Sequence, residues 1–202
     1  MPGNSYFSGH IPHLRGGRQD VARWAAGLRF GDLPHEVVDR ARGATLQAIG
    51  SALLGSQTED GRRAVALITE EEAGVRNGAT IMVSGAGATK GGAAFANSEM
   101  ALAGGKWDTF RMLTHPGTSI IPAALAAAEA RGASGEEFLT GVAAGYEVME
   151  RLASDFIPTV MSRGFHAGPV YFRGRRRRRE NYGFGRGANE QRDCALRESR
   201  ER

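Results

Sequence analysis

Histidine is the side chain in this sequence that is best suited to moving protons near neutral pH, because modest shifts carry its pKa across that range. The chain has five histidines, which are His10, His13, His35, His115 and His166. From neighbouring residues alone, His115 before Pro116 is typical of a turn or a helix cap. His166, two residues after Gly164, is equally compatible with the end of a helix. These positions therefore do not select a reaction on their own.

Hydrophobic periodicity predicts a succession of helices that would position these side chains. Asp20 is a candidate N-cap for a short helix. The apolar face of that helix consists of Val21, Trp24, Ala25 and Leu28. Pro34 stands in the first turn of a longer helix that continues to Gly55. A third helix is predicted from Thr58 to Ala73.

The second half of the chain is also predicted to be largely helical. Residues 79–84 form the one convincing strand-like stretch. An Ala-rich helix is expected at 119–131, with Pro122 in its first turn. Ser134 begins a capping box before a further helix, whose apolar face is Phe138, Val142, Tyr146 and Met149. We therefore predict an all-α fold in which helices lined with Ala and Gly approach each other closely.

Composition divides the chain into a flexible leader at 1–19, a globular part at 20–171 and an Arg-rich tail at 172–202 that we expect to be disordered. The net charge is +4 for the whole chain, but the tail alone holds eleven arginines against five acidic residues. Residues 1–171 consequently carry −2. Any basic surface for nucleic acid or an anionic membrane is thus confined to the tail.

Three observations on the sequence indicate where the protein is located. No apolar run reaches the roughly 18–20 residues that span a bilayer, so no membrane partner is expected. The N-terminus lacks the apolar region of a secretory signal. The single cysteine, Cys194, cannot form a disulfide within the chain, which suits a reducing compartment. We therefore expect a cytoplasmic protein.

Seven segments resemble, in order and spacing, the MmgE/PrpD family of enzymes. They are residues 24–38 (WAAGLRFGDLPHEVV), 93–97 (AAFAN), 107–109 (WDT), 114–118 (THPGT), 122–129 (PAALAAAE), 145–152 (GYEVMERL) and 163–167 (RGFHA). No segment is specific by itself. The resemblance lies in their joint order over most of the chain.

The resemblance implies that residues 20–171 are the N-terminal part of a helical domain. Enzymes of this family act on small polycarboxylates without a metal or an organic cofactor. They dehydrate 2-methylcitrate, decarboxylate cis-aconitate or epimerise iminodisuccinate, and they commonly form dimers, so a homodimer is possible here. In each reaction, charge develops beside an existing carboxylate. The site therefore needs cations and a group that moves a proton near neutral pH.

The resemblance also implies which residues form the site. The matching positions are Asp108, Thr109, His115 and His166. The two histidines would bind carboxylate and transfer protons, Thr109 would form a hydrogen bond, and Asp108 retains the acidic residue before the threonine. Gly105 departs from the family, since it stands where the family has the first aspartate of Asp-x-Asp-Asp-Thr. His10, His13 and His35 match no site position, and we expect them to be exposed.

The tail resembles the product of a shifted reading frame. Where the family continues with an Ala-rich helix, this chain has Phe172-Arg-Gly followed by five arginines. The arginine codon CGC, read from its second base, becomes GCC, which encodes alanine. A legal choice of codons for Tyr171 to Ser199, read one base later, encodes Ile-Phe-Gly, six alanines and a long amphipathic segment. We interpret the tail as a frameshift.

This interpretation has consequences for activity and stability. The resemblance implies a later active-site lysine and a smaller α/β domain over the cleft, and the frameshift would replace both. We therefore expect exposed apolar helix faces, a tendency to aggregate, and no useful catalysis by this chain. The alternative is a non-catalytic protein whose Arg-rich tail binds nucleic acid, because RNA-binding segments have a similar composition. We favour the frameshift and do not expect a nucleic-acid partner.

Overall fold

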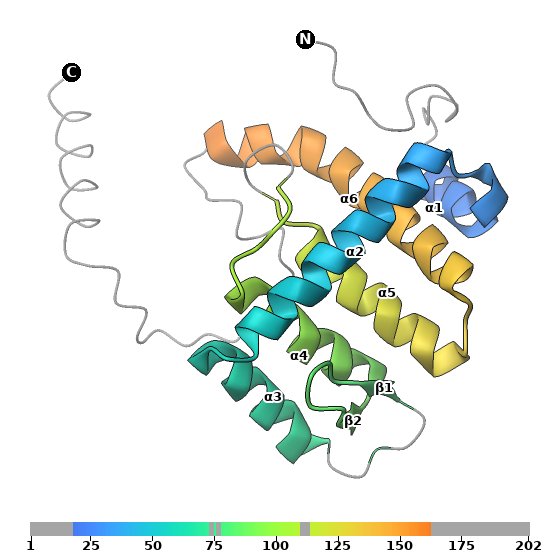
Figure 1. Cartoon of the computed structure of the whole chain (residues 1–202). Coiled ribbons are helices and arrows are strands. Elements are labelled where there is room, and N and C mark those ends of the chain that lie inside the picture. The colour runs from blue at the N-terminus through green and yellow to red at the C-terminus, as the bar shows by residue number, and fades with distance from the viewer. Residues whose placement is uncertain (1–17, 73–74, 76–77, 110–113, 163–202) are drawn as a thin grey trace, which may run out of the picture. The chain divides into compact units, whose positions relative to one another are not determined.

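The computed structural model describes residues 18–72, 75, 78–109 and 114–162, and the fold is described for these residues (Figure 1). Helices α1 (Arg18–Gly27), α2 (His35–Gly55) and α3 (Glu59–Glu71) come first, with a short 3-10 turn, η1 (Phe30–Asp32), between α1 and α2. Strands β1 (Ala79–Thr80) and β2 (Gly87–Ala88) follow. Helices α4 (Lys90–Ala103), α5 (Gly117–Arg131) and α6 (Gly135–Ser162) complete the described part, so the all-α prediction is confirmed.

Two of the expected helix starts are present as side-chain caps. The Thr58 hydroxyl accepts a hydrogen bond of 3.1 Å from the Gly61 amide at the start of α3. In the capping box of α6, the Glu137 carboxylate accepts from the Ser134 amide and the Ser134 hydroxyl accepts from the Glu137 amide. These hydrogen bonds also lower the pKa of the exposed Glu137 carboxyl. Local sequence therefore determines where these helices begin.

Two other expected starts were wrong. Helix α1 begins at Arg18, inside the predicted leader, and Asp20 is its third residue. The Asp20 carboxylate lies 2.8 Å from an Arg23 nitrogen on the next turn, so it does not act as an N-cap. Helix α5 begins at Gly117, two residues earlier than expected, which leaves Pro122 inside the helix beyond its first turn. Its start is determined by a contact with a distant residue, described below.

The expected strand at 79–84 is reduced to a two-residue antiparallel pair, in which Ala79 pairs with Ala88. The chain turns tightly after it, with φ of +71° at Val83 and +70° at Gly85. Asn97 of α4 holds this hairpin, because its buried side chain accepts from the Met82 amide and donates to the Thr80 carbonyl. The hairpin therefore depends on α4, since two paired residues bury too little surface to stand alone.

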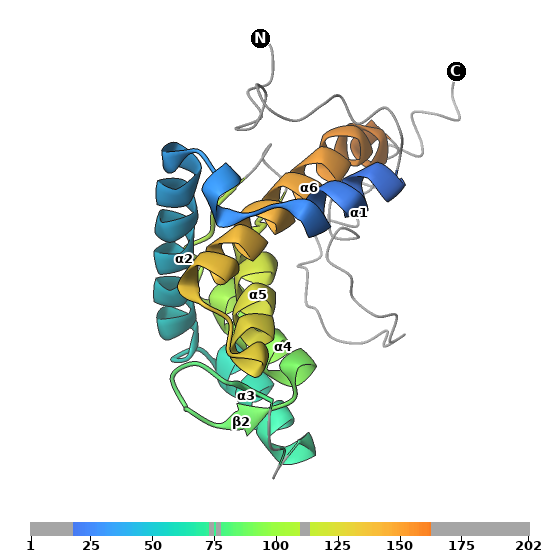
Figure 2. The same ribbon diagram turned by 90° about the vertical axis from the view of Figure 1, so that its right-hand side faces the viewer.

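Helix α4 lies at the centre of the described part and contacts α2, α3 and α5. In Figure 1, α2 runs diagonally in front of α4 and α5, and Figure 2 shows it as a layer beside them. The core between these helices consists mainly of small side chains. Its fully buried members include Ala52, Ala93, Ala96, Ala101 and the larger Ile81 and Met100.

Glycines bring α2 and α4 into backbone contact. A Cβ added at Gly55 would lie 1.8 Å from the Met100 carbonyl oxygen, and one at Gly104 would lie 1.9 Å from the Ser51 carbonyl oxygen. Ser51 itself is buried; its hydroxyl donates to the Ala101 carbonyl and accepts from the Lys106 amide. These contacts attach the loop after α4 to α2, as the predicted close approach of small-residue helices requires.

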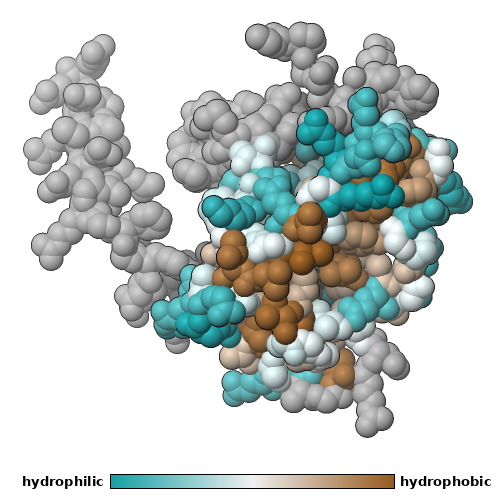
Figure 3. Space-filling view, in the orientation of Figure 1, coloured by the Kyte–Doolittle hydropathy of each residue, from teal (hydrophilic) through white to brown (hydrophobic). Residues whose placement is uncertain are grey.

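Several large apolar side chains of the described part are exposed. Leu46, Leu53 and Leu54 lie on α2, and Leu67 lies on α3. Figure 3 shows apolar side chains gathered over the C-terminal half of α2. Among the described helices, none has the length and apolar character that a membrane crossing requires.

We predict that Gly55→Ala destabilises the protein while Gly50→Ala, on the same helix, stabilises it. The Gly55 variant must move α4 to relieve a backbone clash, at a cost of about 2–3 kcal/mol or more. A Cβ at Gly50 meets nothing within 4 Å. That substitution should gain about 0.5–1 kcal/mol from helix propensity alone. Denaturant unfolding of both variants measures the difference, and equal stability would contradict the close packing of α2 against α4.

Candidate functional site

The loop after α4 brings three of the four predicted site residues together. The Nδ1 atom of His115 lies 2.7 Å from the main-chain carbonyl oxygen of Asp108 and 3.3 Å from the Thr109 hydroxyl. Because a carbonyl oxygen can only accept, Nδ1 must carry the hydrogen. The neutral imidazole therefore has its lone pair on Nε2, which is the atom left for proton transfer.

Trp107 supports the same imidazole from one side. The two ring centroids are 4.5 Å apart and the ring planes are inclined by 47°. The indole nitrogen of Trp107 donates a 2.7 Å hydrogen bond to the Leu102 carbonyl near the end of α4, which fixes the indole to the fold. The orientation of His115 is therefore determined by α4 as well as by its own loop.

The side chain of Asp108 attaches this loop to two helices. Both of its carboxylate oxygens lie 3.0 Å from the Gly117 amide at the start of α5, where an anion is favoured by the helix dipole. One of these oxygens also accepts a 2.7 Å hydrogen bond from the Tyr146 hydroxyl of α6. Asp108 thus caps the start of α5, although it lies nine residues earlier in the chain, and it connects α5 to α6.

Glycine is required at 117 for this arrangement. A Cβ there would lie 2.6 Å from the Tyr146 hydroxyl oxygen and 2.9 Å from an Asp108 carboxylate oxygen. Gly145 has a related function, because a Cβ at that position would lie 2.7 Å from a methyl group of Ile120. The two glycines allow α5 and α6 to approach until Tyr146 reaches Asp108.

Tyr146 acts in this arrangement as a neutral hydrogen-bond donor. Burial raises the pKa of its phenol, and the hydrogen bond to Asp108 and the negative charges of Asp108 and Glu150 raise the pKa further. The hydroxyl consequently keeps its proton throughout the pH range in which the protein would work.

A cavity of about 460 Å³ lies beside this cluster. Its wall is formed by α2, by Asp108 and Thr109 of the loop, and by Tyr146 and neighbouring residues of α6. The charged side chains in that wall, among the described residues, are Asp39, Arg40, Asp108, Glu147 and Glu150. With four carboxylates against one arginine, this part of the site disfavours an anion unless further cations are added or protons are taken up.

Glu150 is a carboxyl of this wall whose pKa is raised. Burial raises its pKa to about 7, and the charges of Glu147 and Asp108 act in the same direction. Glu147 is itself buried and forms an ion pair with Arg151 on the next turn of α6. The carboxyl of Glu150 is therefore near half protonation at neutral pH.

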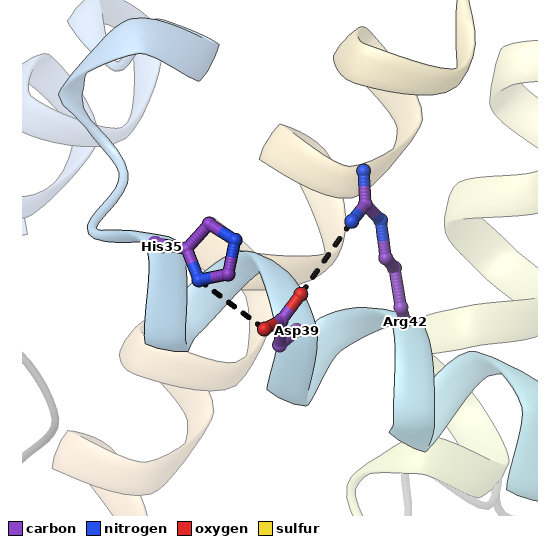
Figure 4. Close-up of polar contacts among 3 residues, drawn as sticks. All are labelled: His35, Asp39 and Arg42. Carbon is purple, nitrogen blue, oxygen red and sulfur yellow. Dashed lines mark hydrogen bonds and ion pairs between the residues drawn. The ribbon is translucent and has the colours of Figure 1, made fainter.

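The other histidine in the described part of the chain is His35. His35 is 86% exposed and pairs with Asp39 across 3.2 Å, while Arg42 lies 3.5 Å from the other carboxylate oxygen (Figure 4). Its predicted exposure is confirmed. His166, like His10 and His13, lies outside the described residues. Gly105, at the position where the sequence departs from the family, has φ of +70°, a conformation that glycine adopts without strain.

Several residues that hold the site were not predicted from the sequence. Tyr146 was assigned only to the apolar face of its helix, although Gly145-Tyr-Glu was among the segments that carried the resemblance. Trp107 and Gly117 were likewise part of quoted segments without an assigned role. Among the residues that the structure describes, no group of three or more His, Cys, Asp or Glu side chains could hold a metal ion.

We predict that Glu150→Gln increases stability in a pH-dependent manner. The carboxyl's ordinary pKa is 4.5 and its folded value is about 7, so between these values the folded chain holds a proton that the unfolded chain has released. The stability from holding that proton is full below pH 4.5 and is lost as the pH rises through 7. Gln cannot ionise, so the variant should melt a few degrees above the parent at pH 8.

The control for this prediction is Glu70→Gln, an exposed glutamate of α3. Melting temperatures of the three proteins are compared at pH 5 and pH 8. The advantage of Glu150→Gln should be small at pH 5 and larger at pH 8, whereas Glu70→Gln should show the same offset at both. An equal offset for Glu150→Gln at the two pH values would mean that its carboxyl does not titrate as described.

Comparison with known families agrees with the resemblance seen in the sequence. The model of the MmgE/PrpD N-terminal domain matches residues 19–172, which is most of the chain. No curated protein and no solved structure matches the chain. The segments that build the site (loop 104–109, the His115-Pro-Gly turn and the Gly145-Tyr-Glu segment) all lie within the matched range. The chain therefore belongs to the MmgE/PrpD family, with its N-terminal domain at residues 19–172.

Proposed function

We propose that this chain is part of a lyase or isomerase that acts on small polycarboxylates, with His115 moving a proton beside a substrate carboxylate. The observation that carries the proposal is the 2.7 Å hydrogen bond between His115 Nδ1 and the Asp108 carbonyl. This bond leaves the lone pair of the neutral ring on Nε2. An imidazole held in one tautomer and one orientation is suited to general acid–base catalysis.

The proposed reaction class is that of 2-methylcitrate dehydration or cis-aconitate decarboxylation. In the dehydration, Nε2 would take a proton from a carbon next to a carboxylate, the electron pair would form the double bond, and the neighbouring hydroxyl would leave as water after protonation. The exposed Thr109 hydroxyl, 3.3 Å from His115 Nδ1, is placed to donate a hydrogen bond to a substrate oxygen. His166 would supply a further cation or proton donor.

The charge of the cavity wall supports the proposal that this chain does not catalyse the reaction by itself. Asp39, Asp108 and the partly ionised Glu150 face a single arginine in this wall, while Glu147 is paired with Arg151, and the remaining negative charge opposes the binding of a polycarboxylate. The cations that the reaction requires would come from residues that a family member has beyond this domain, including the later lysine. We propose that a frameshift near Tyr171 replaced them, in a protein that is cytoplasmic and cofactor-independent. The family match ends at residue 172, where the arginine-rich composition begins.

We predict that the chain as it stands does not turn over 2-methylcitrate or cis-aconitate, and that a gene restored by one base near codon 171 encodes an active enzyme. In the restored enzyme, His115→Gln should lower kcat by about 10²–10⁴-fold, as expected for loss of a general acid–base group. The matched control is His35→Gln, which removes an exposed histidine of α2 and should leave kcat unchanged. Steady-state kinetics with both substrates measures the effect.

Three outcomes would contradict this proposal. Turnover by the present chain would show that the tail does not abolish activity. Full activity of the restored His115→Gln enzyme would remove His115 from catalysis. Sequencing the coding DNA on both strands past codon 202 would contradict the frameshift if the neighbouring frame does not encode a long continuation of the family. In that case, salt-sensitive RNA binding that is lost on deleting residues 172–202 would favour the nucleic-acid alternative.

A further inference from the structure

Tyr146 and His115 are connected through a single residue. The Tyr146 hydroxyl donates to the Asp108 carboxylate across 2.7 Å, and the main-chain carbonyl of the same Asp108 accepts from His115 Nδ1 across 2.7 Å. Asp108 lies in the loop between α4 and α5. Its carbonyl can hold the imidazole only if its own backbone is held in place.

The side chain of Asp108 attaches its backbone to two helices. The carboxylate is attached to the Gly117 amide and to the Tyr146 hydroxyl, which approach it from two different helices. The Gly117 amide lies 3.0 Å from both carboxylate oxygens, and the Tyr146 hydroxyl adds a second donor from another direction, which constrains the plane of the carboxylate further. The amide alone would therefore leave the loop and its carbonyl less constrained.

We propose that Tyr146 is a positioning residue that sets the tautomer of His115 by fixing Asp108. The proposal rests on the proposed function for its catalytic meaning, since the tautomer decides which nitrogen can accept a proton from a substrate. The tyrosine does not contact the imidazole and takes no part in proton transfer. Its partner Gly145 allows the close approach of α6 to Ile120 of α5 that brings the hydroxyl within reach.

The test is a measurement of the His115 tautomer in the full chain, without substrate. Histidine is labelled with ¹⁵N in the ring, and the Nδ1 and Nε2 signals are classified as protonated or unprotonated at a pH where the ring is neutral. His115→Gln identifies the signals of His115, and those of exposed His35 serve as an internal reference. The unmodified chain should show hydrogen on Nδ1 of His115, and hydrogen on Nε2 would overturn the proposal at once.

The decisive variant is Tyr146→Phe, which removes only the hydroxyl. The ratio of the Nδ1–H to the Nε2–H tautomer should fall roughly three- to tenfold, as expected for weakening one hydrogen bond. The matched control is Thr140→Val, which deletes a hydroxyl that donates within α6 to the Glu136 carbonyl and has no connection to Asp108. It should leave the ratio unchanged.

A second variant keeps the proposal testable if Tyr146→Phe does not fold, as judged by circular dichroism. Asp108→Asn retains the size of the side chain but weakens its acceptance of both donors, so the same fall in the ratio is expected. An unchanged ratio in whichever variant folds would overturn the proposal. The measurement does not depend on turnover, because an inactive restored enzyme with a normal His115 tautomer would contradict the proposed function and leave this inference standing.

Discussion

The position of the loop that follows α4 depends on the backbone contact between α2 and α4. At Gly55 and Gly104 the two helices are too close for any side chain. Beside them, the Ser51 hydroxyl donates a hydrogen bond to the Ala101 carbonyl and accepts one from the Lys106 amide. A buried hydroxyl with both a donor and an acceptor partner costs little and specifies one geometry. The loop that continues to Asp108 and Thr109 therefore leaves α4 in a defined direction.

Asp108 transmits that direction to the rest of the site through two separate groups. Its carboxylate fixes the start of α5 and the hydroxyl of Tyr146, while its carbonyl fixes His115. The family resemblance implies a catalytic role for Asp108. In the structure, its hydrogen bonds also determine the positions of its neighbours. The Asp108 carboxylate also explains why glycine follows His115-Pro, since a side chain at position 117 would push this carboxylate away from the start of α5.

The electrostatics of the cavity are unbalanced in the described part. Glu147 is neutralised by Arg151, and the pKa of Glu150 rises to about 7 because burial and its acidic neighbours oppose ionisation. Such a wall is stable when further positive charge lies against it, and it repels a polycarboxylate when none does. The described part of the cavity wall therefore carries an excess of negative charge.

The sequence by itself determined the helical class and the helix starts at Thr58 and Ser134, because these depend on local hydrogen bonds. Its resemblance to the family grouped Asp108, Thr109 and His115, which lie close together in the chain. It misplaced the starts of α1 and α5 and overestimated the strand at 79–84. Helix α5 begins at Gly117 because of Asp108, and the hairpin exists because Asn97 of α4 satisfies its backbone. Only the tertiary structure placed Tyr146 beside Asp108, since that contact joins residues 38 positions apart and depends on the packing of α5 against α6.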